Sequence, residues 1–346
     1  MSQAQPTILA LDAHGGDFGP PVTVAAAVDA VAADPGLTIH LVGLPEQLEE
    51  QIAVCVAEAG TEHRERLQLV PADKVIAGDA RPVAVLRKGE GSSLWNAMRE
   101  LAEGRAHACV SAGNTVAMMT LGVKLVGTLA GIRRPALMSQ IPSSRGMTSM
   151  LDLGANLNVD ADQLFQFALM GAVACASDTG KPPSIGLLNV GHEDSKGHSV
   201  VREAHERLKG SGLDYRGFIE GHDIFAGKVD VAVCDGFAGN LILKSSEGLA
   251  GMLFGELKRT LGSSFRARLG GWLARPALTT MLERLDPAKH NGAPLLGLRG
   301  VVVKSHGGAG RFALFQALLE ASREVQRNVP ERIEKMIRSH QAEAES

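Results

Sequence analysis

Cysteine is scarce in this sequence, and its few cysteines lie far apart. The 346 residues contain only Cys55, Cys109, Cys175 and Cys234, and no two of them have the spacing of zinc ligands. No secretory signal is recognisable at the amino terminus. These absences exclude a disulfide-stabilised secreted domain and a zinc ribbon. We expect four buried, small apolar side chains in a cytoplasmic protein.

Aromatic residues are also scarce, and the chain has no large excess of one charge and no long apolar run. Aromatic residues make up 4% of the chain, and the formal net charge is −3. This composition argues against a nucleic-acid partner bound by base stacking and basic patches. Because no uncharged apolar run reaches about 18 residues, we expect no membrane-spanning helix.

Glycine is abundant, and short apolar runs alternate with amphipathic stretches along the whole chain. The sequence contains 40 glycines and 45% hydrophobic residues. The expected strands are 7–13, 38–43, 107–112, 148–154, 184–190, 229–235 and 300–306. The expected helices are 21–34, 45–60, 92–104, 114–130, 160–176, 198–210, 239–262 and 310–328. This alternation predicts an α/β fold with a mostly parallel sheet between helices.

The expected organisation is one α/β catalytic unit of two lobes over residues 7–330, followed by a terminal helix and polar tail over 331–346. The segment 72–91, "ADKVIAGDARPVAVLRKGEG", fits no regular element and carries the four cations Lys74, Arg81, Arg87 and Lys88. A long loop of this kind is often functional. A solvent-exposed surface loop without a function would explain this segment as well, and both interpretations stay open.

Four expected strands end in glycine-rich turns that precede helices. The turns are "DAHGGDFGP" (12–20), "SAGNTVA" (111–117), "DGFAGN" (235–240) and "SHGGAG" (305–310). The carboxyl ends of parallel strands meet at one edge of a sheet, where ligand crevices form. Glycine lets the backbone approach a ligand closely, and a helix N-terminus attracts anions. We therefore expect a phosphate or a phosphate-like ligand at this edge.

The first turn also permits a metal interpretation. Asp12, His14 and Asp17 resemble the Asp-x-His opening of metal-dependent phosphoesterases. That class needs further histidines after Gly-Asn pairs, but Gly113-Asn114 precedes a threonine and Gly239-Asn240 a leucine. The cluster "GHEDSKGH" (191–198) is expected to be an exposed turn. The sequence favours a site in which backbone amides of the glycine turns hold an anion. A metal-dependent phosphoesterase is the alternative.

Longer phrases give the chain a family resemblance. They are "LALDAHGGDFGP", "RPVAVLRKGEGSSLWNAM", "VSAGNTVAMM", "GIRRPAL", "LDLGANL", "QFALMGAV", "GLLNVGHEDSKG", "EGHDIFAGKVDVAVCDGFAGNLILKSSEG" and "LDPAKHNGAPLLGLRGVVVKSHG". In this order and spacing, over residues 8–328, the chain resembles the PlsX family of acyl-carrier-protein:phosphate acyltransferases. It departs from the family pattern at His14, Ala238, His290 and Phe218, where Met, Thr, Tyr and Asn are usual.

The resemblance implies a fold and a reaction. The fold is a three-layer α/β/α arrangement like that of phosphotransacetylases and isocitrate-dehydrogenase-like enzymes, with a protruding helical hairpin. The reaction is reversible transfer of a long acyl chain from acyl carrier protein to inorganic phosphate, giving acyl phosphate for phospholipid synthesis without a cofactor. The resemblance also implies a homodimer at the inner face of the plasma membrane, supplying a membrane glycerol-3-phosphate acyltransferase.

This reaction needs no nucleophilic side chain, because phosphate attacks an activated thioester directly. The enzyme has to hold an anion beside the carbonyl and stabilise the developing oxyanion. As catalytic candidates we select Lys196, Asn240 and His306. The substrate-binding candidates are Asp12, Gly15, Gly16, Asp17, Gly113, Asn114, Asp235 and Gly239. Plainer interpretations stay open: Lys196 as a solvated loop lysine, Asp12 and Asp235 as caps, and His306 as a histidine at the edge of the core.

Residues 247–285 form a different pattern. Between Leu257 and Leu282 there are five basic residues and no acidic one, and Leu261, Phe265, Leu269, Trp272 and Leu273 supply an apolar face. Two amphipathic helices joined near "GSS" are expected to serve a dimer interface or an anionic membrane surface. The same cations would suit an acidic carrier protein. An ordinary hairpin packed on its own core is the alternative.

Overall fold

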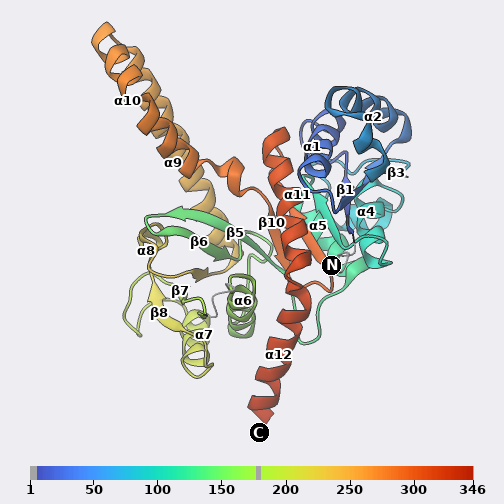
Figure 1. Cartoon of the computed structure of the whole chain (residues 1–346). Helices are drawn as coiled ribbons and strands as arrows, with labels where there is room; N and C mark the ends of the chain where they lie inside the picture. The colour runs from blue at the N-terminus through green and yellow to red at the C-terminus, as the bar shows by residue number, and fades with distance from the viewer. Residues whose placement is uncertain (1–5, 177–180, 346) are drawn as a thin grey trace.

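The computed structural model describes residues 6–176 and 181–345 and shows two lobes joined by one sheet (Figure 1). Within these residues the strand order is β3-β2-β1-β4-β11-β10-β5-β6-β9-β7-β8. The strands are β1 Thr7–Asp12, β2 Leu37–Gly43, β3 Leu67–Pro71, β4 Ala108–Ser111, β5 Ala136–Ser143, β6 Gly146–Leu151, β7 Ile185–Leu188, β8 Tyr215–Ile219, β9 Val231–Val233, β10 Ala293–Leu296 and β11 Val301–Lys304.

Helices cover both faces of this sheet, which confirms the expected three-layer α/β fold. The α-helices are α1 Pro20–Ala33, α2 Pro45–Ala59, α3 Pro82–Lys88, α4 Ser93–Ala102, α5 Thr115–Leu121, α6 Ala161–Ala174, α7 Ser199–Lys209, α8 Gly221–Ala226, α9 Gly236–Gly262, α10 Phe265–Leu285, α11 Arg311–Gln326 and α12 Val329–Glu345. Ser346, the last residue of the expected tail, lies outside the described residues.

The first lobe is built on five parallel strands, in which β11 from the far end of the chain pairs with β4. Side chains along a strand alternate between the two faces. Leu9 and Leu11 accordingly join a cluster with residues of α1, α2 and α11, whereas Ala10 joins residues of α4 and α5 on the other face. Burial on both faces explains the near-continuous apolar runs in these strands.

The second lobe continues the same sheet. The strands β10, β5 and β6 pair antiparallel, and β6, β9, β7 and β8 then pair parallel. Phe167 of α6 is fully buried in a core that includes Val231 of β9 and Ile333 of α12. The terminal helix α12 therefore packs against this lobe and is part of its core. The division of the chain at residue 330 stays a prediction.

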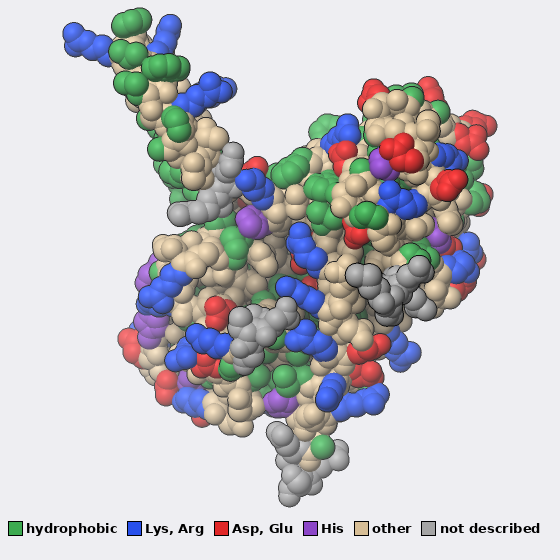
Figure 2. Space-filling view, in the orientation of Figure 1, with side chains coloured by type: hydrophobic (Ala, Val, Ile, Leu, Met, Phe, Trp, Pro, Cys, Tyr) green, Lys and Arg blue, Asp and Glu red, His purple; other side chains and the backbone are tan. Residues whose placement is uncertain are grey.

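The helices α9 and α10 form the expected hairpin, which projects from the body of the molecule (Figure 1). Ser264 begins α10 by accepting a hydrogen bond from the Ala267 amide at 3.2 Å. Apolar and basic side chains lie together along its outer part (Figure 2); Trp272 is 67% exposed and Phe265 81%. No helix among the described residues combines the length and the apolar character needed to cross a membrane.

Several elements differ from the sequence-based expectation. The strands β3, β5, β8 and β10 were not expected; β8 reads "YRGFI" and β10 is a four-residue "APLL", both poor strand patterns. The segment 72–91 contains the helix α3, so describing it as wholly irregular was wrong. The expected helix 114–130 ends earlier: α5 stops at Leu121 and continues as a π-helical segment, Gly122–Val126.

Candidate active site

Three polar side chains lie in a row where neighbouring strands of the first lobe end. The register pairs Asp12 of β1 with Ser111 of β4, and Ser111 with Lys304 of β11. The Ser111 hydroxyl donates to Asp12 Oδ2 at 2.7 Å. Because the strands are parallel, their carboxyl ends place one carboxyl, one hydroxyl and one amine at the same edge of the sheet.

A cleft of about 490 Å³ opens above this row. Seven of the eleven sequence-predicted site residues line it: Asp12, Gly15, Gly16, Asp17, Gly113, Asn114 and His306. Side chains that the sequence analysis did not select line it too, namely Lys304 and Ser93 of the first lobe and Lys244 of α9. The cleft therefore lies between the first lobe and the base of the projecting hairpin.

Two of the glycine turns approach each other very closely on the floor of the cleft. A Cβ atom on Gly15 would lie 2.8 Å from both the Gly113 nitrogen and Ser111 Oγ. The amides expected to hold an anion are only partly free: the Gly15 amide donates to the Asp12 carbonyl, and the Gly113 amide to Ser111 Oγ at 2.9 Å. Glycine at 15 is thus required by the contact between turns.

Other backbone amides in the cleft remain available. Within the described residues, the amides of Gly16, Asn114 and Gly307 donate to no protein acceptor. All three residues line the cleft. Unpaired backbone N–H groups around one concavity are the arrangement that binds anions in proteins.

Asp12 is the most buried carboxyl group in the cleft. Only 3% of the residue is exposed, and within the described residues its Oδ1 has no hydrogen-bond partner. Burial raises the pKa of Asp12, while the hydroxyls of Ser93 and Ser111 offset part of that effect. A carboxyl oxygen without a partner in a polar cleft is suited to accept a hydrogen bond from a protonated ligand oxygen.

Lys304 supplies a partly buried cation near Asp12. Its ammonium donates to the carbonyl oxygens of Ala112, at 3.2 Å, and Ser305. Burial lowers the pKa of Lys304 to about 8, and repulsion from Lys244 adds to this shift. Two lysines that disfavour each other's charge are stabilised by an anion bound between them.

The two histidines of the cleft have different surroundings. The His306 Nδ1 accepts from the Gly308 amide at 3.2 Å, so a neutral ring carries its proton on Nε2. The His14 Nε2 accepts from the Leu44 amide at 3.0 Å, and burial lowers the pKa of His14. His14 therefore ties the first glycine turn to the loop after β2, whereas His306 is exposed and has a donor to offer.

Asn114 joins the cleft to the segment 72–91. Its Oδ1 accepts from the Ala117 amide at 2.9 Å and so caps α5, and its Nδ2 donates to the Gly78 carbonyl at 2.7 Å. Val75 and Ile76 of the same segment also line the cleft. The side chain of Asn114 thus holds this segment against the site, and its backbone amide faces the site.

Four candidates lie outside the cleft lining: Lys196, Asp235, Gly239 and Asn240. Asp235 caps α9 by accepting from the Ala238 amide at 2.8 Å. A Cβ atom on Gly239 would lie 1.9 Å from the Asp152 carbonyl, so this glycine lets α9 pack on the end of β6. Asn240 precedes Lys244 by one helical turn and shares its face of α9.

Lys196 is exposed on the loop that follows β7. The loop closes locally, because the Lys196 amide donates to Glu193 and the Asn189 side chain donates to the Lys196 carbonyl. As expected, residues 191–198 form a mostly exposed turn. The roles assigned to Lys196 and to the other three candidates stay predictions.

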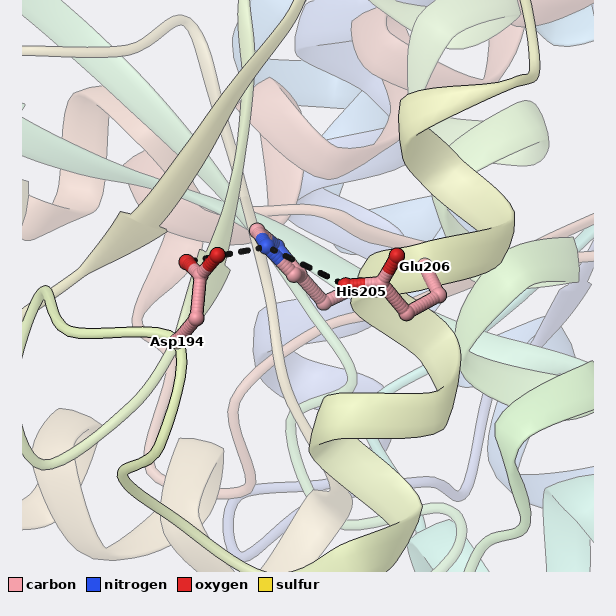
Figure 3. A group of neighbouring side chains, drawn as sticks. All are labelled: Asp194, His205 and Glu206. Carbon is pink, nitrogen blue, oxygen red and sulfur yellow. Dashed lines mark ion pairs between the residues drawn. The ribbon is translucent and has the colours of Figure 1, made fainter.

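Among the described residues, one trio of acidic and histidine side chains has ligand atoms close enough to share a metal ion: Asp194, His205 and Glu206 (Figure 3). The His205 Nε2 lies 3.4 Å from Asp194 Oδ1 and 4.0 Å from Glu206 Oε1. The ammonium of Lys209 already bridges the two carboxylates, at 3.2 and 3.0 Å. We assign this trio to the packing of α7 in the second lobe.

Sequence reasoning missed Lys304 and Lys244. Lys304 ends the apolar run "GVVVK". Its position at the carboxyl end of an expected parallel strand could have indicated that it belongs to the site. Lys244 carried no such signal, because only the path of α9 across the cleft brings it there.

The fold and the cleft define a class of two-lobed α/β protein in which lysines and unpaired backbone amides line a cleft between the lobes. The same fold occurs in a phosphotransacetylase from Streptococcus pyogenes, with a TM-score of 0.60, 16% identity and coverage of 93% of this chain and 95% of that one. It also occurs in a branched-chain phosphotransacylase from Enterococcus faecalis V583, with a TM-score of 0.54, 14% identity and coverage of 92% and 99%. At these identities the likeness concerns the fold.

A family model described as "Fatty acid synthesis protein" matches residues 7–332, and the chain belongs to this family. A phosphate acyltransferase of Ectopseudomonas mendocina is 46% identical over 328 residues, 94% of this chain and 96% of the relative. The phosphate acyltransferase of Alkalilimnicola ehrlichii is 44% identical over 339 residues, 98% of each chain. The family expected from the sequence is confirmed, and the protein is an acyltransferase.

Proposed function

We propose that this enzyme transfers a long-chain acyl group from acyl carrier protein to inorganic phosphate, forming an acyl phosphate for phospholipid synthesis. The observation that carries the proposal is the cleft, in which two lysines, three unpaired amides and one partnerless carboxyl oxygen surround a single concavity. Relatives of the chain over nearly its full length are named phosphate acyltransferases.

Phosphate fits this set of groups by charge and by protonation. Lys304 and Lys244 balance its negative charge, and the amides of Gly16, Asn114 and Gly307 donate to its oxygens. The Asp12 Oδ1 accepts the one P–OH group of the hydrogen phosphate dianion. A carboxyl in the site thus selects a protonated oxyanion over sulfate, which has no such proton at neutral pH.

The chemistry then needs no covalent enzyme intermediate. A phosphate oxygen attacks the thioester carbonyl carbon, the new C–O bond forms, and the C–S bond breaks. The proton of the phosphate passes to Asp12 and the departing thiolate takes a proton from the solvent, while Nε2–H of His306 is proposed to donate a hydrogen bond to the leaving sulfur. Asn240 and Lys196 are proposed to act on the acyl side, where the carbonyl oxygen becomes negative.

The metal-dependent phosphoesterase is the less favoured alternative. His14 already accepts the Leu44 amide on Nε2, and Asp12, His14 and Asp17 do not form a group with mutually close ligand atoms. The names of the relatives also point to acyl transfer.

The cellular setting follows from the hairpin and from the product. We propose a cytoplasmic homodimer whose hairpin contacts the anionic inner face of the plasma membrane. There the labile acyl phosphate would pass to a membrane glycerol-3-phosphate acyltransferase. Exposed Leu269, Trp272 and Leu273 beside arginines support this contact.

The test incubates the purified full chain with palmitoyl-acyl carrier protein, with and without inorganic phosphate. We expect phosphate-dependent release of free carrier and formation of palmitoyl phosphate, unchanged by a divalent-metal chelator. Release without phosphate would contradict the proposal, and loss of turnover on chelation would restore the metal alternative.

A further inference from the structure

A surface of apolar and basic side chains flanks the mouth of the cleft. We name it the α3–α5 face and define it by Val83 and Leu86 of α3 and by Val116 and Val123 of α5 and its π-helical extension. These four side chains are between 41% and 60% exposed. The two helices pack on each other, and Lys124 donates to the Leu86 carbonyl at 3.5 Å. Val116 also lines the cleft, so the face leads directly into the site.

The cations around this face are free of acidic partners. Arg81, Arg87 and Lys88 are exposed and form no ion pair with any described residue. Arg105, by contrast, pairs with Glu100 at 2.7 Å. Asp79 and Glu90 are near in the sequence but form no ion pair with these cations, so the cations stay available to an acidic partner.

The stretch that supplies α5 is depleted of acidic residues, whereas the segment that supplies α3 also carries Asp79 and Glu90. The 48 residues between Glu103 and Asp152 contain five Lys or Arg and no Asp or Glu. This stretch supplies α5, its extension and the exposed Lys124. The chain as a whole has a net charge of −3, so this stretch is basic in a chain that is acidic on average.

We propose that the α3–α5 face is the docking surface for the acidic carrier protein that delivers the acyl thioester. This inference rests on the proposed function, because the occupant is the donor substrate of that reaction. Charge complementarity selects an acidic partner, and exposed valines and a leucine between the cations fit the apolar side of an amphipathic helix. The position at the mouth of the cleft lets a carrier-borne thioester enter while its protein stays outside.

The hairpin is the other basic and apolar surface of the molecule. It projects from the second lobe, whereas α5 belongs to the first (Figure 1). A carrier bound to the outer part of the hairpin would hold its thioester away from the cleft. The observations therefore favour the α3–α5 face for the carrier.

The test compares two acyl donors, palmitoyl-acyl carrier protein and carrier-free palmitoyl-pantetheine, in the full-length enzyme. For the variant R81E/R87E/K88E, we expect KM for the carrier substrate to rise about tenfold or more, because electrostatic steering contributes factors of 10 or greater. Its kcat, and its kcat/KM for palmitoyl-pantetheine, stay unchanged. The milder R81Q/R87Q/K88Q variant should give a smaller rise in the same KM.

The matched control is K258E/R266E/R275E, which reverses three exposed cations of the hairpin that also lack an ion pair among the described residues. A rise in the carrier KM in this variant, with none in the first, would overturn the assignment. Equal loss with both acyl donors would also overturn it. Should the wild type not turn over the carrier substrate, the proposed function fails, and direct titration with the carrier decides whether the face binds it.

Discussion

Replacement of Lys304 by methionine probes the proposed phosphate site at its more buried lysine. The substitution keeps an unbranched side chain out to the ε position and removes the charge-assisted hydrogen bonds expected between the ammonium and phosphate. Such bonds contribute about 1.5–3 kcal/mol, and every 1.4 kcal/mol is about a factor of ten. We therefore expect kcat/KM for phosphate to fall about 10- to 100-fold in K304M, while KM for the acyl donor stays near its wild-type value.

The pH dependence makes the same prediction sharper. Because the pKa of Lys304 is about 8, the side chain is charged at neutral pH and loses its proton above pH 8. In the wild type, kcat/KM for phosphate should decline through this range. The variant K304R keeps a charge throughout, since arginine does not deprotonate in proteins. It should retain part of the phosphate affinity and lose the alkaline decline.

Initial rates of carrier release, measured against phosphate concentration at several pH values, supply both readouts. Thermal unfolding supplies the folding control, and we expect no loss of Tm in K304M, because burial disfavours the charge that it removes. The reasoning is refuted if K304M keeps wild-type kcat/KM for phosphate. An alkaline decline that persists unchanged in K304R would refute the assignment of the pKa.

Two further predictions concern the cleft floor and the hairpin. Gly15→Ala should lower phosphate affinity at least about tenfold, because its Cβ would lie 2.8 Å from a backbone nitrogen of the neighbouring turn. The control Gly78→Ala places its Cβ in open space and should bind phosphate normally. Calorimetric titration compares the two variants, and equal affinities would contradict the close packing of the cleft floor. L269E/W272E should release the enzyme from anionic liposomes in a flotation assay, while turnover of the carrier substrate stays intact. The control L157E, at a 61% exposed site on the body of the molecule, should remain bound. Continued binding of the double variant would refute the membrane role of the hairpin.

The sequence predicted those parts of the fold that local patterns specify. The strand β1 and its turn were recognisable because a buried apolar run is followed by glycines, and the same holds for β4 and β11. The strand β5, "ALMSQIPS", was not recognisable, because its Ser, Gln and Pro residues give a weak strand pattern, and it forms in an antiparallel pairing with β6. That pairing is set by tertiary structure, which a single local window does not contain.

The candidate site shows the same division between local and long-range information. Residues on the glycine turns were found because the signal is contained in a few consecutive positions, as for Gly16 and Asn114. The approach of Lys244 was not predictable, because it depends on the angle at which a 27-residue helix leaves the sheet. The unexpected use of the Asn114 side chain, as a tie to Gly78, depends on a contact 36 positions away.

The position of β11 has a consequence for biosynthesis. This strand comes from residues 301–304 and is inserted between β4 and β10, in the middle of the sheet. A ribosome-bound chain that has not yet emerged to residue 304 leaves β4 with an open edge and lacks Lys304 altogether. On the proposed function, the anion site cannot assemble before residue 304 has joined the sheet, so a chain that lacks β11 would make no acyl phosphate.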